Sequence, residues 1–247
     1  MLSQAEKGGV QNTIQNCVTV LQNDPVLADS IRLNLLSERI DIVKPMGWQR
    51  SGPTLTDTDM MYILRRMEKY GLYSEKRVSA AIRIVANENH YHPIRDYLND
   101  LKWDGTARIS RALHRFLGAA EDELTTEALK IFLLGAIRRV FHPGCKFEMM
   151  LCLVGGQGAG KSSFFRLLAI KDEWFSDDLR RLDDDNVFRK LQGHWIMEMS
   201  EMIATANAKS IEEIKSFLSK QKETYKIPYE THPADRLRQC VFAGTTN

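Results

Sequence analysis

The sequence lacks the features that mark membrane, secreted and zinc-binding proteins. Its longest apolar runs, residues 149–154 and 131–134, are far too short to span a bilayer, and its first residues hold no signal-peptide core. None of its four cysteines belongs to a Cys-x-x-Cys pair, which argues against a zinc site or a disulfide framework. We therefore expect a soluble, cytoplasmic protein.

An excess of charge of either sign is also missing. The 247 residues include 34 basic and 32 acidic side chains, a formal net charge of +2. A protein that covers nucleic acid with its whole surface would be more basic, so any contact with nucleic acid must come from a local patch. The length allows one large domain or two small ones.

Residues 1–145 are predicted to form a mainly helical N-terminal domain. Apolar residues recur at helical spacing in 12–22, 59–70, the segment after Ser74 and 126–141, and Ile40 and Ile42 indicate a short strand. The second and third of these helices match a DNA-reading helix-turn-helix as well as an ordinary packed hairpin. We favour the hairpin because such pairs recur in helical domains.

Residues 146–247 alternate strands with helices. Apolar runs at Met149–Val154, Trp195–Met199 and Cys240–Ala243 are typical of strands buried on both faces of a parallel sheet. Helical segments near 162–169, 184–191 and 210–220 lie between them. The pattern predicts an α/β domain in which the three strands are parallel neighbours in one sheet.

A glycine-rich loop follows the first of these strands. Residues 155–162, Gly-Gly-Gln-Gly-Ala-Gly-Lys-Ser, fit the phosphate-loop pattern G-x-x-x-x-G-K-[ST] at every fixed position. Glycine lets backbone N–H groups face a phosphate, and the next helix adds the positive end of its dipole. A chance match in a chain this long is expected on the order of one time in a hundred, and here a strand and a helix flank the loop.

The loop predicts binding of ATP with Mg²⁺. The Lys161 ammonium can reach the outer phosphates, and the Ser162 hydroxyl can ligate the metal ion. The predicted nucleotide-binding residues are Gly155, Gly156, Gln157, Gly158, Ala159, Gly160, Lys161, Ser162 and Ser163.

An enzyme of this type also needs an acid near the metal. Glu201 would emerge at the end of the strand that begins at Trp195, and we favour it as the metal-side acid. Glu198 lies within that strand and is the second candidate, with a structural ion pair as the alternative for either. Asn247 ends the last strand, where an amide can orient the attacking water or contact the γ-phosphate; a loop-capping role is its alternative.

A basic segment with interleaved aromatic residues separates the last two strands. Phosphate contacts and base stacking on such a segment suit single-stranded DNA, although a solvated helix face is the ordinary explanation for part of it and the better one for the segment taken alone. The candidate DNA-binding residues are Lys215, Lys222, Tyr225, Lys226 and Tyr229.

The order of these motifs resembles the virulence-associated protein E family. The match is carried by residues 143–146, the loop, Trp195–Glu201, Pro228-Tyr229 and Thr245-Thr246-Asn247, and also by Asp96-Tyr97-Leu98 and Trp103-Asp104-Gly105. The family consists of P-loop proteins of phages, plasmids and pathogenicity islands that are related to superfamily 3 and primase-associated helicases.

The resemblance implies an ATPase core of the AAA+ or superfamily 3 type that forms a ring, usually a hexamer, and moves along DNA. Lys161 and Ser162 would then contact phosphate and metal, Glu201 would be the acidic motif, Asn247 the sensor, and Lys222–Tyr229 a DNA-contacting hairpin. The family continues past the position of Asn247, so we expect a core that is incomplete at its C-terminal end. The alternatives are a phosphotransferase and a nucleotide-binding interaction module without turnover.

Overall fold

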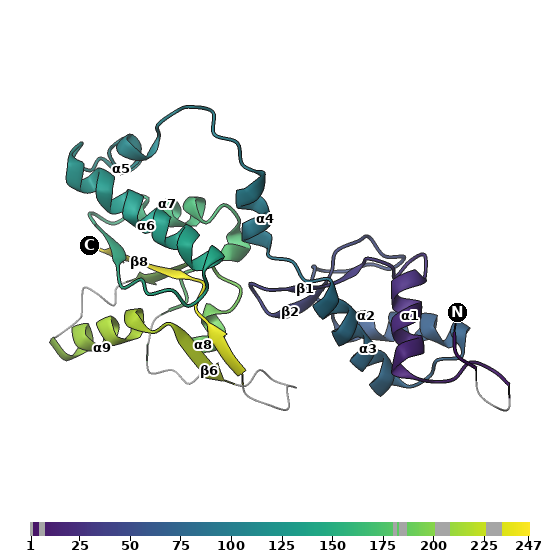
Figure 1. Cartoon of the computed structure of the whole chain (residues 1–247). Coiled ribbons are helices and arrows are strands. Elements are labelled where there is room, and N and C mark those ends of the chain that lie inside the picture. Colours follow the sequence, from purple (N-terminus) through teal and green to yellow (C-terminus); the bar gives the residue numbers. More distant parts are fainter. Residues whose placement is uncertain (1, 5–7, 180–181, 183–186, 201–207, 226–233) are drawn as a thin grey trace. The chain divides into compact units, whose positions relative to one another are not determined.

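The computed structural model describes residues 2–4, 8–179, 182, 187–200, 208–225 and 234–247 (Figure 1). The chain divides into two compact units, Met1–Asp96 and Tyr97–Asn247. The division falls at residue 96 rather than at residue 145, where the change from helices to alternating strands suggested it. None of the helices in the described part is long and apolar enough to cross a membrane.

The N-terminal unit combines helices with one β-hairpin. The predicted helices are present as α1 (Ile14–Asn23), α2 (Asp57–Met67) and α3 (Glu75–Glu88), and a short 3₁₀ turn, η1 (Glu68–Tyr70), extends α2. Strands β1 (Ile31–Asn34) and β2 (Arg39–Ile42) pair antiparallel. Helix α3 packs chiefly on α1 and on the hairpin rather than on α2, its neighbour in sequence. The core is formed by residues such as Cys17, Leu21, Ile63, Met67, Val78 and Ile82.

A buried carboxylate fixes the start of α2. Asp59, 2% exposed, accepts hydrogen bonds from Trp48 Nε1 at 2.7 Å and Arg50 Nε at 2.8 Å. It also forms a capping box with Thr56. Burial alone would raise the pKa of the Asp59 carboxyl, but the hydrogen bonds outweigh it and hold the pKa well below its ordinary value.

We expect Asp59→Asn to lower the stability of the N-terminal unit by about 1 to 3 kcal/mol at pH 7, the worth of hydrogen bonds to a charged group. Because the folded pKa is depressed, this stabilisation is complete above the unfolded pKa of about 4 and is lost as pH falls through the folded value. Urea titrations at pH 7 and pH 3, read by hydrogen exchange of α2, would test this. The exposed Asp57 on the same helix provides the control, Asp57→Asn. An equal loss for Asp59→Asn at both pH values would contradict the role of its charge.

The C-terminal unit is built on a four-stranded parallel sheet. Its strands are β3 (Met150–Val154), β4 (Phe175–Ser176), β5 (Ile196–Ser200) and β8 (Val241–Thr246), in the order β3-β8-β5-β4. The three predicted strands thus share one parallel sheet, as expected for an α/β unit. They are not all direct neighbours, because β8 lies between β3 and β5 and pairs with both. The prediction of burial on both faces is wrong for β3, an edge strand whose residues are half-buried or exposed.

Helices and a second hairpin surround this sheet. In chain order they are α4 (Pro93–Asp100), which begins in the N-terminal unit, α5 (Ile109–Leu117), α6 (Glu123–Phe141), α7 (Lys161–Leu168), η2 (Asp172–Trp174), α8 (Val187–Leu191) and α9 (Ala208–Ser219). Strands β6 (Lys222–Tyr225) and β7 (Ala234–Leu237) pair antiparallel. In the view of Figure 1, α6 and α9 lie on opposite sides of β8.

Helix α6 packs against the sheet, and a buried arginine of this helix forms hydrogen bonds with backbone oxygens next to the strands. Arg139 is fully buried, and its guanidinium donates to the backbone oxygens of Cys240 at 2.7 Å and Phe147 at 2.8 Å. Trp195 Nε1 donates to the oxygen of Ala136, one turn earlier in α6, at 3.0 Å. These bonds join α6 to the starts of three strands, which is why the division falls before this helix.

Candidate functional site

The glycine-rich loop joins β3 to α7 at the carboxyl end of the parallel sheet, as predicted. Gly158 and Gly160 have φ values of 81° and 82°, in the left-handed region that favours glycine. The loop is tied to the neighbouring strand by a hydrogen bond of 3.2 Å from Gly155 N to the oxygen of Thr246. Ligands of open parallel sheets bind at this edge.

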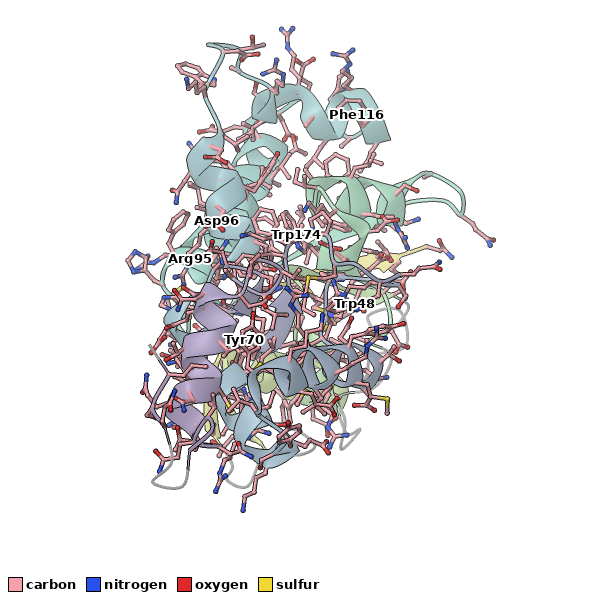
Figure 2. All side chains as sticks on the ribbon, turned by 90° about the vertical axis from the view of Figure 1, so that its right-hand side faces the viewer. Trp48, Tyr70, Arg95, Asp96, Phe116 and Trp174 are labelled. Carbon is pink, nitrogen blue, oxygen red and sulfur yellow. The ribbon has the colours of Figure 1, made fainter. Side chains whose placement is uncertain are left out.

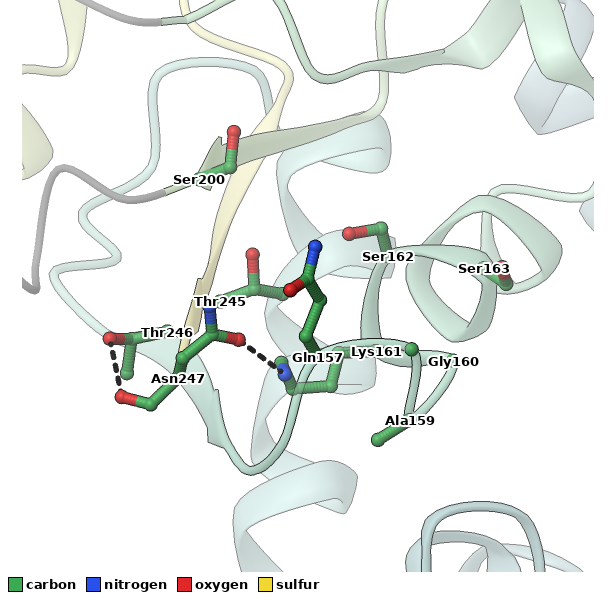
Figure 3. A pocket seen from close by; sticks show the side chains of 11 residues that line it. Gln157, Ala159, Gly160, Lys161, Ser162, Ser163, Ser200, Thr245, Thr246 and Asn247 are labelled. Atoms are coloured by element: carbon green, nitrogen blue, oxygen red, sulfur yellow. Dashed lines mark hydrogen bonds between the residues drawn. The ribbon is translucent and has the colours of Figure 1, made fainter.

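Lys161 is the first residue of α7, and its ammonium turns back over the loop. It donates to the oxygens of Gly155 and Gly156, the latter at 2.9 Å. It also donates to Asn247 Oδ1 at 3.3 Å, although the two residues are 86 positions apart (Figure 3). The fold therefore brings together the predicted phosphate-binding lysine and the predicted sensor amide.

Glu198 lies directly beside Ser162. Its Oε1 atom accepts hydrogen bonds from Ser162 Oγ at 2.7 Å and from Thr245 Oγ1 at 2.5 Å. The Glu198 side chain is fully buried, and its Oε2 atom has no hydrogen-bond partner among the described residues. A buried carboxylate oxygen without a donor is costly, and a cation or a water ligand of a cation would satisfy it.

Lys161, Ser162 and Asn247 line a pocket of about 560 Å³, whereas the predicted residues Gly155 and Gly156 and the buried Glu198 do not reach its wall (Figure 3). The size falls within the range of small-molecule sites. The walls come from the loop, the first turn of α7 and the ends of β5 and β8: Gln157, Gly158, Ala159, Gly160, Lys161, Ser162, Ser163, Ser200, Thr245, Thr246 and Asn247. Sequence reasoning assigned no role to Ser200 or to Thr245 and Thr246. The sequence feature that could have identified Ser200, Thr245 and Thr246 is that each is a small polar residue at the end of an apolar strand.

The donor set fits a metal ion that is shared with a phosphate ligand. No cluster of three or more His, Cys, Asp or Glu side chains occurs in the described part of the chain. Mg²⁺ does not need one, because it binds through one or two carboxylates, waters and substrate phosphates. The Ser162 hydroxyl and the free oxygen of Glu198 match that mode.

The remaining predicted residues do not line this pocket or are not described. Glu201, Lys226 and Tyr229 lie outside the described residues, as does the side chain of Tyr225 at the end of β6. Lys215 on α9 pairs with Glu212 at 2.8 Å, and Lys222 on β6 pairs with Asp235 on β7. The two described lysines thus lie on separate elements, each with an acidic neighbour.

Comparison with known proteins gives a family and a fold. Residues 98–247 match the profile of the virulence-associated protein E-like domain. No curated protein sequence matches the chain. An apo structure of the NrS-1 C-terminal region matches with TM-score 0.55 and 13% identity over 96% of this chain and 58% of that one. Its A form matches with TM-score 0.50 and 13% identity over 87% and 53%. The chain spans little more than half the length of these structures, and such low identity shows a shared fold only.

Proposed function

Because this chain belongs to the virulence-associated protein E-like domain family, we propose that its C-terminal unit is a P-loop ATPase core that binds ATP with Mg²⁺. The observation that carries the proposal is the contact of Ser162 Oγ with the buried carboxylate of Glu198, 2.7 Å away, at the end of a glycine-rich loop. A hydroxyl at this loop position and an acid on another strand of the same sheet are the two protein groups that hold a phosphate-bound metal.

Each residue then has a distinct task. Loop N–H groups and the α7 N-terminus bind phosphate oxygens, and Lys161 exchanges its contacts with loop carbonyls for the outer phosphates. Ser162 and Glu198 hold the metal side. Asn247 Oδ1 accepts from Lys161 at 3.3 Å, and this contact supports a role for its amide in orienting the terminal phosphate or an attacking water. Bound Mg²⁺ would neutralise charge on the phosphates. Glu201 remains a candidate for activating the water.

The core would serve a helicase-like replication protein of a phage or mobile element. This part of the proposal is supported by the family membership, by the strand order of the sheet and by the β6–β7 hairpin with Lys222. Lys215 on α9 adds a second exposed cation to the same unit. Translocation on DNA, through Lys222, Tyr225, Lys226 and Tyr229, and assembly into a ring follow from the resemblance to superfamily 3 helicases.

Lys161→Ala tests the phosphate site. We expect ATP affinity in the presence of Mg²⁺ to fall by about 10- to 100-fold, because a charge-assisted contact is worth about 1.5 to 3 kcal/mol. Isothermal titration of the full chain measures it. Lys146→Ala, at an exposed lysine paired with Glu148, is the matched control and should bind as wild type does. If Lys161→Ala bound ATP with unchanged affinity, the glycine-rich loop would not be the phosphate-binding site.

A further inference from the structure

A second hollow lies on the other side of the first turn of α7. It has a volume of about 510 Å³, opens to solvent, and is lined mainly by residues of α5, α6 and α7. Its apolar walls include Ile109, Phe116 and Leu117 from α5, Leu133 from α6, and Phe164 and Leu167 from α7. The motifs of the sequence gave no role to any of these residues.

The rim of this hollow exposes large apolar side chains. Leu167 is 76% exposed, Phe116 (labelled in Figure 2) is 65% exposed, and both line the same space. Single exposed apolar residues are ordinary, but an apolar hollow between them is the usual form of a small-molecule pocket. Phe116 also offers an aromatic ring, which a flat ligand can stack upon.

The hollow adjoins the loop pocket. Gly160 and Ser163 line both spaces. A Cβ atom at Gly160 would lie 4.0 Å from Leu117 Cδ2, so the wall of the hollow begins at the loop itself. A phosphate chain bound at the N-terminus of α7 would therefore leave the loop toward Ser163 and enter this space.

We propose that the hollow between α5, α6 and α7 holds the base of the nucleotide whose phosphates lie on the glycine-rich loop, an inference that rests on the proposed function. The ligand in this hollow must be flat and largely apolar on its faces. It must also carry phosphates that reach the loop pocket across the first turn of α7. A nucleoside triphosphate has both properties. Phe116 and Leu167 are the side chains that contact the base.

The same hollow predicts weak selection between bases. Its only polar side chains among the described residues are those of Arg108 and Ser163. The guanidinium of Arg108 is already paired with the Asp104 carboxylate at 2.6 and 2.9 Å. A site rejects the wrong base strongly only when that base leaves polar groups of the protein without hydrogen-bond partners. This hollow has few such groups, so ATP and GTP should bind with affinities within about threefold of each other.

Inorganic tripolyphosphate separates the base site from the phosphate site. With Mg²⁺ present, Phe116→Ala and Leu167→Ala should each weaken ATP binding by about tenfold, since base stacking on an aromatic ring or burial of one apolar side chain is worth about 1 to 3 kcal/mol. Neither variant should change the affinity for tripolyphosphate. Leu134→Ala, at a 56% exposed residue of α6 outside the hollow, should change neither affinity.

The outcomes are distinguishable by isothermal titration of the full chain. Unchanged ATP affinity in both hollow variants would overturn the base site and leave the phosphate site standing. Equal weakening of ATP and tripolyphosphate would also overturn it, because the side chains would then act on the loop. A wild-type chain that binds neither ligand would refute the proposed function and the base site together. Since Phe116 and Leu167 are largely exposed, their loss leaves the core intact.

Discussion

Replacement of Glu198 by glutamine is expected to lower Mg²⁺-dependent phosphate release from ATP by about 10² to 10³-fold, because the metal contributes several kcal/mol of charge stabilisation. The gain in ATP affinity that Mg²⁺ provides should disappear as well. Glutamine has nearly the same size and keeps an oxygen to accept from Ser162 and Thr245, so the buried position stays filled. What it removes is the negative charge at the oxygen that lacks a partner.

A double variant of Ser162 and Glu198 tests whether the two residues hold the same metal ion. Both Ser162→Ala and Glu198→Gln act on one metal position, so the double variant should be little worse than either single variant. Glu148→Gln, which changes a surface carboxylate paired with Lys146, is the control. If Glu198→Gln keeps the full Mg²⁺ gain, the acid lies elsewhere, and Glu201→Gln in the same titration identifies it.

Arg139→Ala is expected to destabilise the C-terminal unit by about 3 to 5 kcal/mol, the cost of a large buried cavity together with two lost charged hydrogen bonds. The guanidinium is fully buried and holds the backbone oxygens of Cys240 and Phe147. Burial lowers the pKa of Arg139 below its ordinary value, and no carboxylate forms an ion pair with it in the described part of the chain. The backbone oxygens of Cys240 and Phe147 would lose this donor, as would that of Leu218, which accepts a longer bond of 3.5 Å.

Hydrogen exchange measures the loss of stability segment by segment. Such a measurement is needed because the chain has two units and only the C-terminal one should be destabilised. Amides of β3 and β8 should exchange faster in Arg139→Ala, while those of α1 and α3 should not change. Arg138→Ala removes the neighbouring exposed arginine and should leave all of them as in wild type. Wild-type protection of β8 in Arg139→Ala would mean that the helix is held by its apolar contacts alone.

The strands and the loop could be predicted because local pattern determines them. Three apolar runs became β3, β5 and β8, and the loop motif lies between a strand and a helix. The order of strands could not be predicted, since nothing local to Val241–Thr246 says that it enters between two earlier strands. Pairing is decided by packing over long separations, which a single sequence does not display.

The position of Glu198 illustrates the same limit, whereas Glu201 lies outside the described residues and stays a prediction. A strand-end position suggested Glu201, because side chains at strand ends face the ligand edge of a sheet. The first turn of α7 packs over β5, however, so a side chain in the middle of that strand reaches Ser162. Helix α6 gives a parallel case: its pattern predicts an apolar stripe through Ile137, yet Arg139 is buried and Ile137 is 37% exposed.

The central position of β8 has a consequence for synthesis of the protein. Met150 pairs with Phe242, 92 residues later, so β3 has no partner strand until almost the whole unit has left the ribosome. At about 5 to 20 residues per second, that interval lasts about 5 to 20 s. The glycine-rich loop and Lys161 exist as sequence throughout this time, but Thr245 and Asn247 arrive only with β8. The complete pocket therefore cannot form before β8 has been synthesised, and the apolar β3 and β5 segments lack the strand that pairs with both of them during that interval.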